Sequence, residues 1–117
     1  MSDVVINQAM LDQLRMLERA GKSGIFAQMI GMFVKGSGDQ IAAVLAASDA
    51  GDTEKLRVAS HTLKSNAASF GADDLAALCR DIETDARTGV GSLHPDRRMR
   101  LIDVHAASCA ALQREIA

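Results

Sequence analysis

Aromatic residues are nearly absent from this chain of 117 residues, which has three phenylalanines and no tryptophan or tyrosine. Hydrophobic residues nevertheless make up 48% of it, so leucine, isoleucine, valine, methionine and alanine must supply the core. Proline occurs only once, which leaves long segments free to be helical. A chain of this length buries roughly two-thirds of the surface that its unfolded form exposes. We therefore expect one all-α domain over residues 1–117, with residues 1–5 flexible.

Long apolar runs and basic clusters are absent as well. No apolar run approaches the ~20 residues of a membrane span, and no secretory signal sequence is recognisable. The formal net charge is −2, and no group of lysines and arginines offers a surface for nucleic acid. We expect a cytoplasmic protein that binds neither membranes nor nucleic acid.

Cysteine is also scarce, since only Cys79 and Cys109 are present. Each shares a helical face with apolar residues, so we interpret both as small, buried side chains with reduced thiols. Neither forms a zinc-ligand spacing with His94 or His105. The sequence therefore predicts no metal site and no cofactor bound by this chain.

Glycines and the single proline divide the remaining sequence into five segments with helical periodicity. Gly36-Ser37-Gly38 lies inside the second segment, and each glycine weakens a helix interior by about 1 kcal/mol, so we expect a bend or local irregularity there. The predicted helices begin near Ile6, Ser23 or Gly24, Asp52 or Thr53, Asp73, and Pro95. The first four end at Gly21, Ala50, Gly71 and near Gly89, and the last reaches the C-terminus.

The last four segments are long, amphipathic and joined by short turns. Such segments pack most simply as an antiparallel up-down four-helix bundle, with the short first helix over one end. In the final helix we expect an inward apolar stripe at helical spacing. The predicted stripe comprises Met99, Ile102, Ala106, Cys109, Leu112 or Gln113, and Ile116.

One histidine stands apart from the apolar pattern of its helix. Leu56, Leu63 and Phe70 fall within one stripe of the third segment. At about 100° per residue, His61 points roughly 160° from the centre of that stripe. Lys64 and Ser65 lie about one turn further along the same surface. His61 therefore faces water or a partner, beside a cation and small side chains.

The order of residues here resembles the histidine-containing phosphotransfer (HPt) domain family. The resemblance rests on His61-Thr62-Leu63-Lys64, a small residue at Ser65 and a glycine at Gly71, together with the charged amphipathic segment 73–87 that follows. It implies that His61 accepts a phosphoryl group from an aspartyl phosphate on a response-regulator receiver domain, including receivers of hybrid histidine kinases. It also implies that the receiver supplies the Mg²⁺ and that His61 can pass the group to another receiver.

The same resemblance assigns roles to the neighbours of His61. Lys64 adds positive charge beside the phosphoryl oxygens, and the small Ser65 and Ala68 allow a receiver to approach. Family members most often have glycine where Ser65 stands. Glu83 matches a polar position that often lies beside the histidine ring, the alternative being an exposed glutamate without contact to it. Arg57 contacts an acidic receiver face or nothing at all.

The predicted protein is a phosphoryl carrier and not an enzyme, because no glycine-rich nucleotide-binding segment is present to support autokinase activity. We expect it to act as a monomer. The alternative is a helical binding protein that sequesters a receiver or another partner without phosphotransfer. A small-molecule enzyme has little support, since no inward-facing cluster of carboxylates or histidines is evident.

Overall fold

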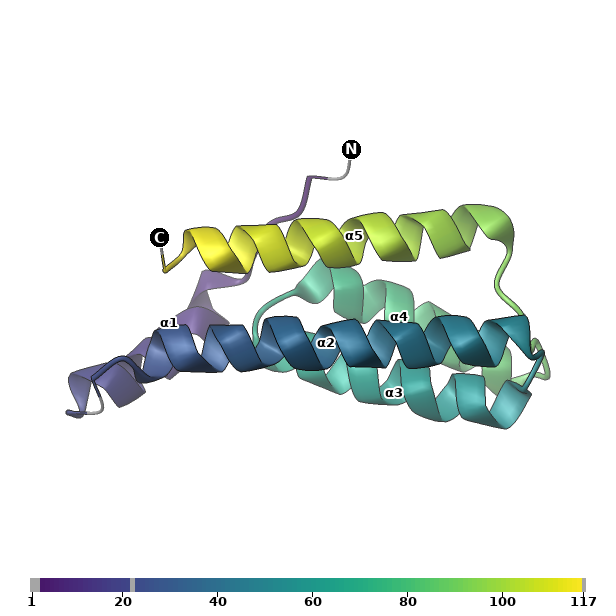
Figure 1. Cartoon of the computed structure of the whole chain (residues 1–117), viewed down its shortest axis with the longest axis horizontal. Helices are drawn as coiled ribbons and strands as arrows, with labels where there is room; N and C mark the ends of the chain where they lie inside the picture. Colours follow the sequence, from purple (N-terminus) through teal and green to yellow (C-terminus); the bar gives the residue numbers. More distant parts are fainter. Residues whose placement is uncertain (1–2, 22, 117) are drawn as a thin grey trace.

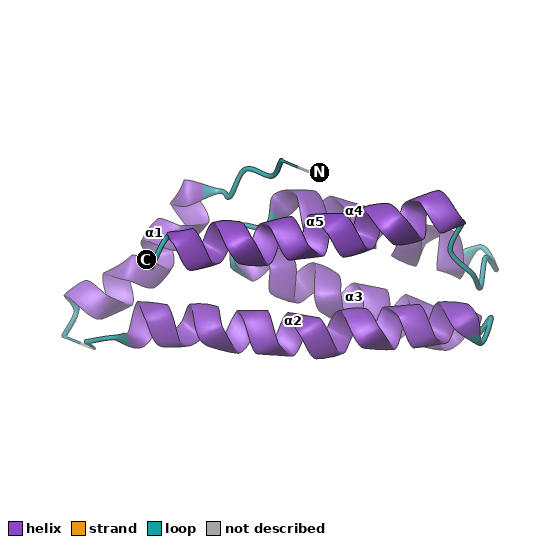
Figure 2. Ribbon diagram, turned by 45° about the horizontal axis from the view of Figure 1, so that its top comes forward, coloured by secondary structure: helices purple, strands orange, loops and turns teal. Residues whose placement is uncertain are grey.

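The computed structural model describes residues 3–21 and 23–116, and these residues form five α-helices and no strand. Figures 1 and 2 show the longer helices lying lengthwise beside one another, with a shorter helix at one end. The prediction of an all-helical chain is confirmed for the described residues. The helices are α1 (Gln8–Arg19), α2 (Ile25–Asp49), α3 (Thr53–Ser69), α4 (Asp73–Arg87) and α5 (Pro95–Arg114).

Side-chain caps mark the starts of α1, α3 and α5. Asp52 caps α3, because its Oδ1 accepts a hydrogen bond from the backbone N–H of Lys55 at 3.0 Å. The sequence left Asp52 and Thr53 as equal alternatives, and Asp52 is the cap. Pro95 occupies the first turn of α5. Backbone N–H groups there have no hydrogen-bond partner within the helix, so the missing N–H of proline costs nothing. The caps agree with the predicted starts of α3 and α5.

The second segment forms a single helix as predicted, and the local irregularity expected at Gly36-Ser37-Gly38 is absent, since α2 is helical without interruption from Ile25 to Asp49. Ser37 is buried, and its Oγ lies 2.9 Å from Nε2 of His105 on α5. Packing of α2 against α1, α3 and α5 offsets the weakness of two glycines, which amounts to about 1 kcal/mol each. Tertiary contacts therefore keep this helix continuous.

The predicted inward stripe of α5 is wrong in part. Leu112 and Cys109 are buried as expected, but Met99 and Ile102 are exposed, and so are Ala106, Gln113 and Ile116. The core side of α5 comprises Leu101, Val104, Ser108, Cys109, Ala111 and Leu112. Apolar residues lie on both sides of this helix, so periodicity alone could not decide which side meets the bundle.

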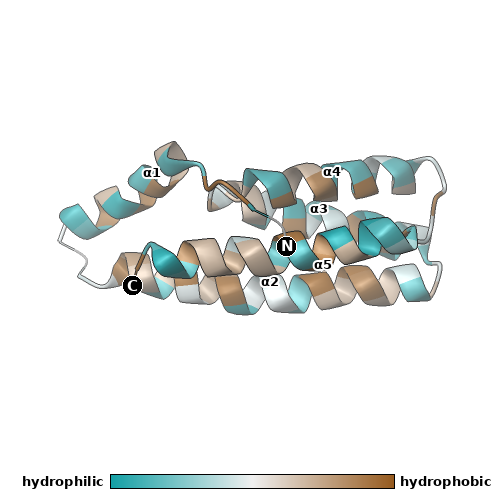
Figure 3. Cartoon of the chain, turned by 90° about the horizontal axis from the view of Figure 1, so that it is seen from above, coloured by the Kyte–Doolittle hydropathy of each residue, from teal (hydrophilic) through white to brown (hydrophobic). Residues whose placement is uncertain are grey.

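Helix α3 packs between α2 and α4, and α5 contacts α2 and α4. Figure 3 shows that hydrophilic and hydrophobic residues alternate along α4, as expected for an amphipathic helix with one solvent-exposed face. The largest side chains sealed between the helices include Phe33, Leu63, Leu75 and Ile82. With α2 on one side and α4 on the other, α3 keeps one strip of its surface open to solvent, and that strip carries His61.

The turn between α3 and α4 also holds the segment before α1. Gly71 has φ +73°, and its carbonyl oxygen accepts a hydrogen bond of 2.8 Å from the backbone N–H of Asn7. A Cβ at Gly71 would lie 2.6 Å from the Asn7 carbonyl oxygen. Asn7 donates from its side chain to Asp73 at 3.0 Å, and the N–H of Val5 donates to Asp74 at 3.4 Å. Glycine is required at this turn both for its conformation and for its lack of a side chain.

Replacing Gly71 with alanine should lower the free energy of unfolding by roughly 3 kcal/mol, because left-handed backbone strain adds to the collision with Asn7. Gly89→Ala is the matched control, since Gly89 has φ +100° but open space around its Cβ position. The control should lose only about 1 kcal/mol, the strain alone. Urea unfolding followed by circular dichroism measures both, and equal losses would contradict the role given to the Asn7 contact.

Both cysteines are free and buried. Burial raises the pKa of the Cys79 thiol to about 12, and it also raises the pKa of Cys109. Cys109 lies 3.4 Å from Nε2 of His105, and burial lowers the pKa of that imidazole. The interpretation of both cysteines as buried side chains is confirmed.

No helix in the described part of the chain combines the length and the hydrophobicity that a membrane span requires.

Candidate phosphoacceptor site

The side chain of His61 projects from the open strip of α3 and is 54% exposed. The opposite face of the helix supplies the core, where Leu56, Ser60 and Leu63 are buried. Helical spacing therefore anchors α3 through one face and presents the imidazole on the other. Because α4 packs beside α3, the ring can reach solvent and a side chain of α4 together.

Glu83 on α4 contacts the His61 ring directly. Of the two alternatives that the sequence left open, contact with the ring or exposure without contact, the structure has the first. Its carboxylate is 2% exposed, and Oε2 lies 2.8 Å from Nδ1 of His61. An ionised carboxylate can only accept hydrogen bonds, so Nδ1 must carry the proton in this pair. The neutral ring then has an unshared electron pair on Nε2. This tautomer makes Nε2 the nucleophilic atom of His61.

Two permanent cations also bind the Glu83 carboxylate. Nζ of Lys64 lies 2.6 Å from Oε1, and Nη2 of Arg87 lies 2.9 Å from Oε2. Lys64 thus contacts the ring's carboxylate partner from the same helix as His61. Arg87 was not among the residues singled out from the sequence, although its position four residues after Glu83 on a helix is a known ion-pair spacing.

The hydrogen bonds around Glu83 decide its charge. Burial raises the pKa of its carboxyl group, but hydrogen bonds from Lys64 and His61 outweigh burial, and the pKa lies below its usual value. A depressed pKa means that this group stabilises the fold above the pKa of an ordinary glutamate. That contribution disappears as the pH falls through the lowered pKa. At neutral pH Glu83 is therefore a charged acceptor.

Ser65 and Ala68 lie on the exposed surface beyond Lys64. Together with Lys64 they line a shallow groove of about 460 Å³ between α3 and α4. The other lining residues are Asp73, Ala76, Ala77 and Arg80. Ser65, Ala68, Ala76 and Ala77 are small, so they leave room for another protein to approach from this side.

Arg57, one turn before His61, forms its ion pair within α3. Its Nη2 lies 2.5 Å from Oε1 of Glu54, and its Nε lies 3.1 Å from Oε2 of the same residue. Hydrogen bonding to Glu54 raises the pKa of the Arg57 guanidinium and lowers the pKa of Glu54. The structure therefore places Arg57 near His61 but outside the group of residues that binds Glu83.

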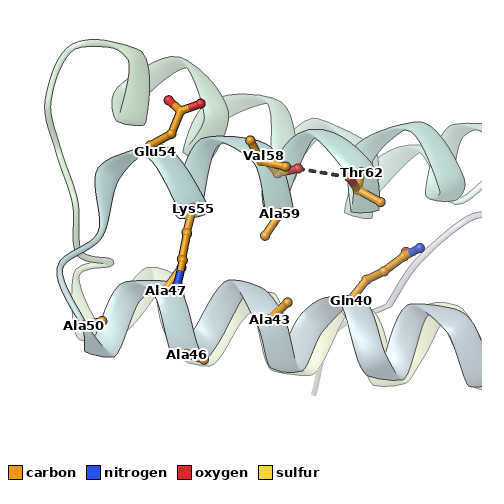
Figure 4. A pocket seen from close by; sticks show the side chains of 10 residues that line it. All are labelled: Gln40, Ala43, Ala46, Ala47, Ala50, Glu54, Lys55, Val58, Ala59 and Thr62. Atoms are coloured by element: carbon orange, nitrogen blue, oxygen red, sulfur yellow. Dashed lines mark hydrogen bonds between the residues drawn. The ribbon is translucent and has the colours of Figure 1, made fainter.

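A second groove, of about 570 Å³, runs between α2 and α3. Figure 4 shows alanines of α2 facing Val58 and Ala59 of α3, with Thr62 and Gln40 at one end and Lys55 reaching across toward α2. Thr62 directly follows His61 in the chain, so this groove reaches the part of α3 that carries His61. Its lining is mostly apolar, and Val58 is exposed within it. Neighbours of His61 on α3 thus line two grooves, one toward α2 and one toward α4.

Comparison with known proteins agrees with the all-helical fold. The structure is similar to the crystal structure of histidine-containing phosphotransfer protein B (HptB) from Pseudomonas aeruginosa PAO1, with a TM-score of 0.81 and 24% sequence identity over 94% of this chain and 92% of that one. No curated protein sequence matches this chain. The family model of the Hpt domain matches residues 28–116, which include α3, α4 and the whole His61 site. The chain therefore belongs to the Hpt domain family.

Proposed function

We propose that this protein is a phosphorelay intermediate that accepts a phosphoryl group on Nε2 of His61 from a receiver-domain aspartyl phosphate and passes it to another receiver. The observation that carries the proposal is the exposed imidazole whose Nδ1 donates to the buried, ionised Glu83. Family membership supports a histidine phosphotransfer role. The identity of the receivers, including any within a hybrid histidine kinase, is open to experiment.

The proposed transfer begins with the lone pair of Nε2 attacking phosphorus as the bond to the aspartate oxygen breaks. An N–P bond forms, and the aspartate leaves as a carboxylate. The ring still carries its Nδ1 proton and is positive, a charge that the Glu83 carboxylate stabilises. The proton stays on Nδ1, hydrogen-bonded to Glu83, while His61 carries the phosphoryl group. Transfer to the next receiver reverses these steps, and the ring then keeps a single proton on Nδ1.

Lys64 is proposed to stabilise the phosphoryl oxygens electrostatically. Its ammonium group binds the same Glu83 carboxylate that contacts the His61 ring, so it lies close to the imidazole. We propose that the Mg²⁺ of the reaction belongs to the receiver and that this chain binds no cofactor. Carriage without autokinase activity is proposed because the sequence has no glycine-rich nucleotide-binding segment. The reaction is therefore shared between two proteins, of which this one contributes the acceptor.

Receiver docking is proposed to be transient, over the surface around His61. Ser65 and Ala68 provide small side chains for close approach, the groove between α2 and α3 provides apolar area, and Arg57 offers a partly exposed guanidinium to an acidic partner. The modest size of this surface favours rapid dissociation. We propose that the protein docks as a monomer.

We further propose that residues 1–117 form one domain in which α2 to α5 make an antiparallel up-down four-helix bundle. Short connections between these helices and the packing of α5 against α2 and α4 support this arrangement. A cytoplasmic location is proposed, where phosphorylated receivers would be available. Residues 1–2 lie outside the described residues, so the flexibility expected for 1–5 stays a prediction.

The test is to mix the purified protein with a ³²P-phosphorylated receiver and Mg²⁺. Label should move to the 12.4 kDa chain in a form that is stable to alkali and lost in acid, as expected for phosphohistidine. Receivers of the source organism are assayed one by one, so that the fastest donor identifies the cognate partner. Binding of a receiver without transfer of label from any of them would support sequestration instead and contradict the proposal.

A further inference from the structure

The Glu83 carboxylate beside His61 carries one negative charge but pairs with two cations, Lys64 and Arg87. Lys64 occupies Oε1 of Glu83, whereas Arg87 and the ring both occupy Oε2. With the imidazole neutral, one negative charge faces two permanent cations. The site therefore holds one unit of positive charge in excess before any phosphoryl group arrives.

The two cations differ in how firmly they are held. The Lys64 side chain is 27% exposed and joins α3 to α4, whereas Arg87 is 60% exposed and pairs with Glu83 four residues before it on the same helix. The Glu83 end of both pairs is buried, but the guanidinium of Arg87 is the more exposed cation, so water can hydrate it when it leaves the carboxylate. Arg87 is thus the donor that can most easily leave the carboxylate.

From this asymmetry we propose that Arg87 is a second phosphoryl ligand, which binds Glu83 in the unphosphorylated protein and turns to the phosphoryl oxygens once Nε2 of His61 carries the group. The inference rests on the proposed phosphoacceptor role of His61. A guanidinium suits this task, since its planar fork donates two parallel hydrogen bonds to a phosphate. Its departure leaves Oε2 entirely to Nδ1, while Lys64 still satisfies Oε1.

The exchange has a consequence for both states of the protein. Before transfer, Arg87 donates to Oε2 of Glu83, the same oxygen that accepts from Nδ1 of His61. After transfer, it offsets part of the charge of the phosphoryl group, which the carboxylate would otherwise repel. Arg87 would thus favour the phosphorylated form of His61 over the free form without taking part in bond making.

The experiment uses phosphoramidate, a small phosphodonor that modifies histidine without a receiver. The full-length protein is phosphorylated and its phosphorus resonance is titrated by ³¹P NMR, in the unaltered protein and in Arg87→Gln, Arg87→Lys and the control Arg100→Gln, which removes an exposed charge on α5. Loss of a nearby cation should raise the midpoint of the phosphoryl ionisation by roughly half a pH unit in Arg87→Gln. Arg87→Lys should shift it less, and Arg100→Gln should leave it unchanged.

A second readout follows the guanidinium itself. The ¹⁵N and ¹H resonances of the Arg87 side chain should shift when His61 is phosphorylated. An unchanged ³¹P midpoint in Arg87→Gln, with His61 phosphorylated and the helical circular dichroism retained, would overturn this inference and leave the phosphoacceptor role intact. Failure of both phosphoramidate and phosphorylated receivers to modify His61 would instead remove the proposed function, and this inference with it.

Discussion

Replacing His61 with glutamine should abolish acid-labile phosphate on the protein, whether the donor is a phosphorylated receiver or phosphoramidate. Glutamine fills a similar volume and its amide nitrogen can donate to Glu83, but it has no nucleophilic ring nitrogen. The residue is exposed, so the fold should be retained and the free energy of unfolding should change by less than about 1 kcal/mol. Label transfer followed by gel electrophoresis measures the first effect, and urea unfolding measures the second.

His94→Gln is the control for this result. His94 is also exposed, but it lies at the start of α5, where its Nδ1 accepts from the N–H of Asp96 at 3.1 Å and no buried carboxylate orients it. That variant should take up phosphate at the rate of the unaltered protein. Label that survives in His61→Gln, or disappears in His94→Gln, would show that the acceptor has been assigned to the wrong side chain.

The second large effect is expected at Glu83. Glu83→Ala removes the acceptor of the Nδ1 proton, so the ring can adopt the tautomer that blocks Nε2, and the rate of phosphotransfer should fall roughly 10- to 100-fold. Glu83→Gln keeps an oxygen that can accept from Nδ1 but removes the negative charge, and it should lose less. Rapid-quench measurement with a phosphorylated receiver gives the rates, and ¹⁵N NMR of the imidazole reports the tautomer.

The two readouts separate an orienting role from a structural one. A merely structural glutamate would slow transfer only to the extent that its loss unfolds the protein, with the tautomer unchanged in the folded fraction. Glu83→Asp is the matched variant, since it keeps the charge but withdraws the carboxylate from the ring. Transfer rates that are equal in Glu83→Ala and in the unaltered protein would contradict the orienting role.

Much of the fold follows from local signals in the sequence. The glycines at 21, 51, 71 and 89 all adopt positive φ values, and each lies within two residues of the end of one of the first four helices. Asp52 and Pro95 mark helix starts through hydrogen bonding and ring geometry, which depend on near neighbours only. The sequence predicts a single helix over this segment, but its regular passage through Gly36-Ser37-Gly38 could not be predicted, because the side chain that contacts Ser37 comes from His105 on α5, 68 residues away in the chain.

The site divides in the same way between local and distant information. His61, Lys64 and their exposure follow from the spacing along α3. Contact between His61 and Glu83 depends on how α4 is rotated against α3, a quantity that periodicity leaves uncertain by about one side-chain position. Arg87 could have been noticed as the partner of Glu83 on α4. Its closeness to the ring depends on that same rotation.

The buried thiol of Cys79 gives this small protein a built-in reporter of motion. Cys79 lies on α4, one turn before Glu83, and is sealed from solvent. Because burial raises its pKa to about 12, an alkylating reagent meets almost no thiolate in the closed molecule at neutral pH. Alkylation must wait until α4 separates from its neighbours. The rate of Cys79 modification therefore measures how often the helix that carries Glu83 separates from its neighbours, and comparison of the protein before and after treatment with phosphoramidate would tell which form is the more rigid.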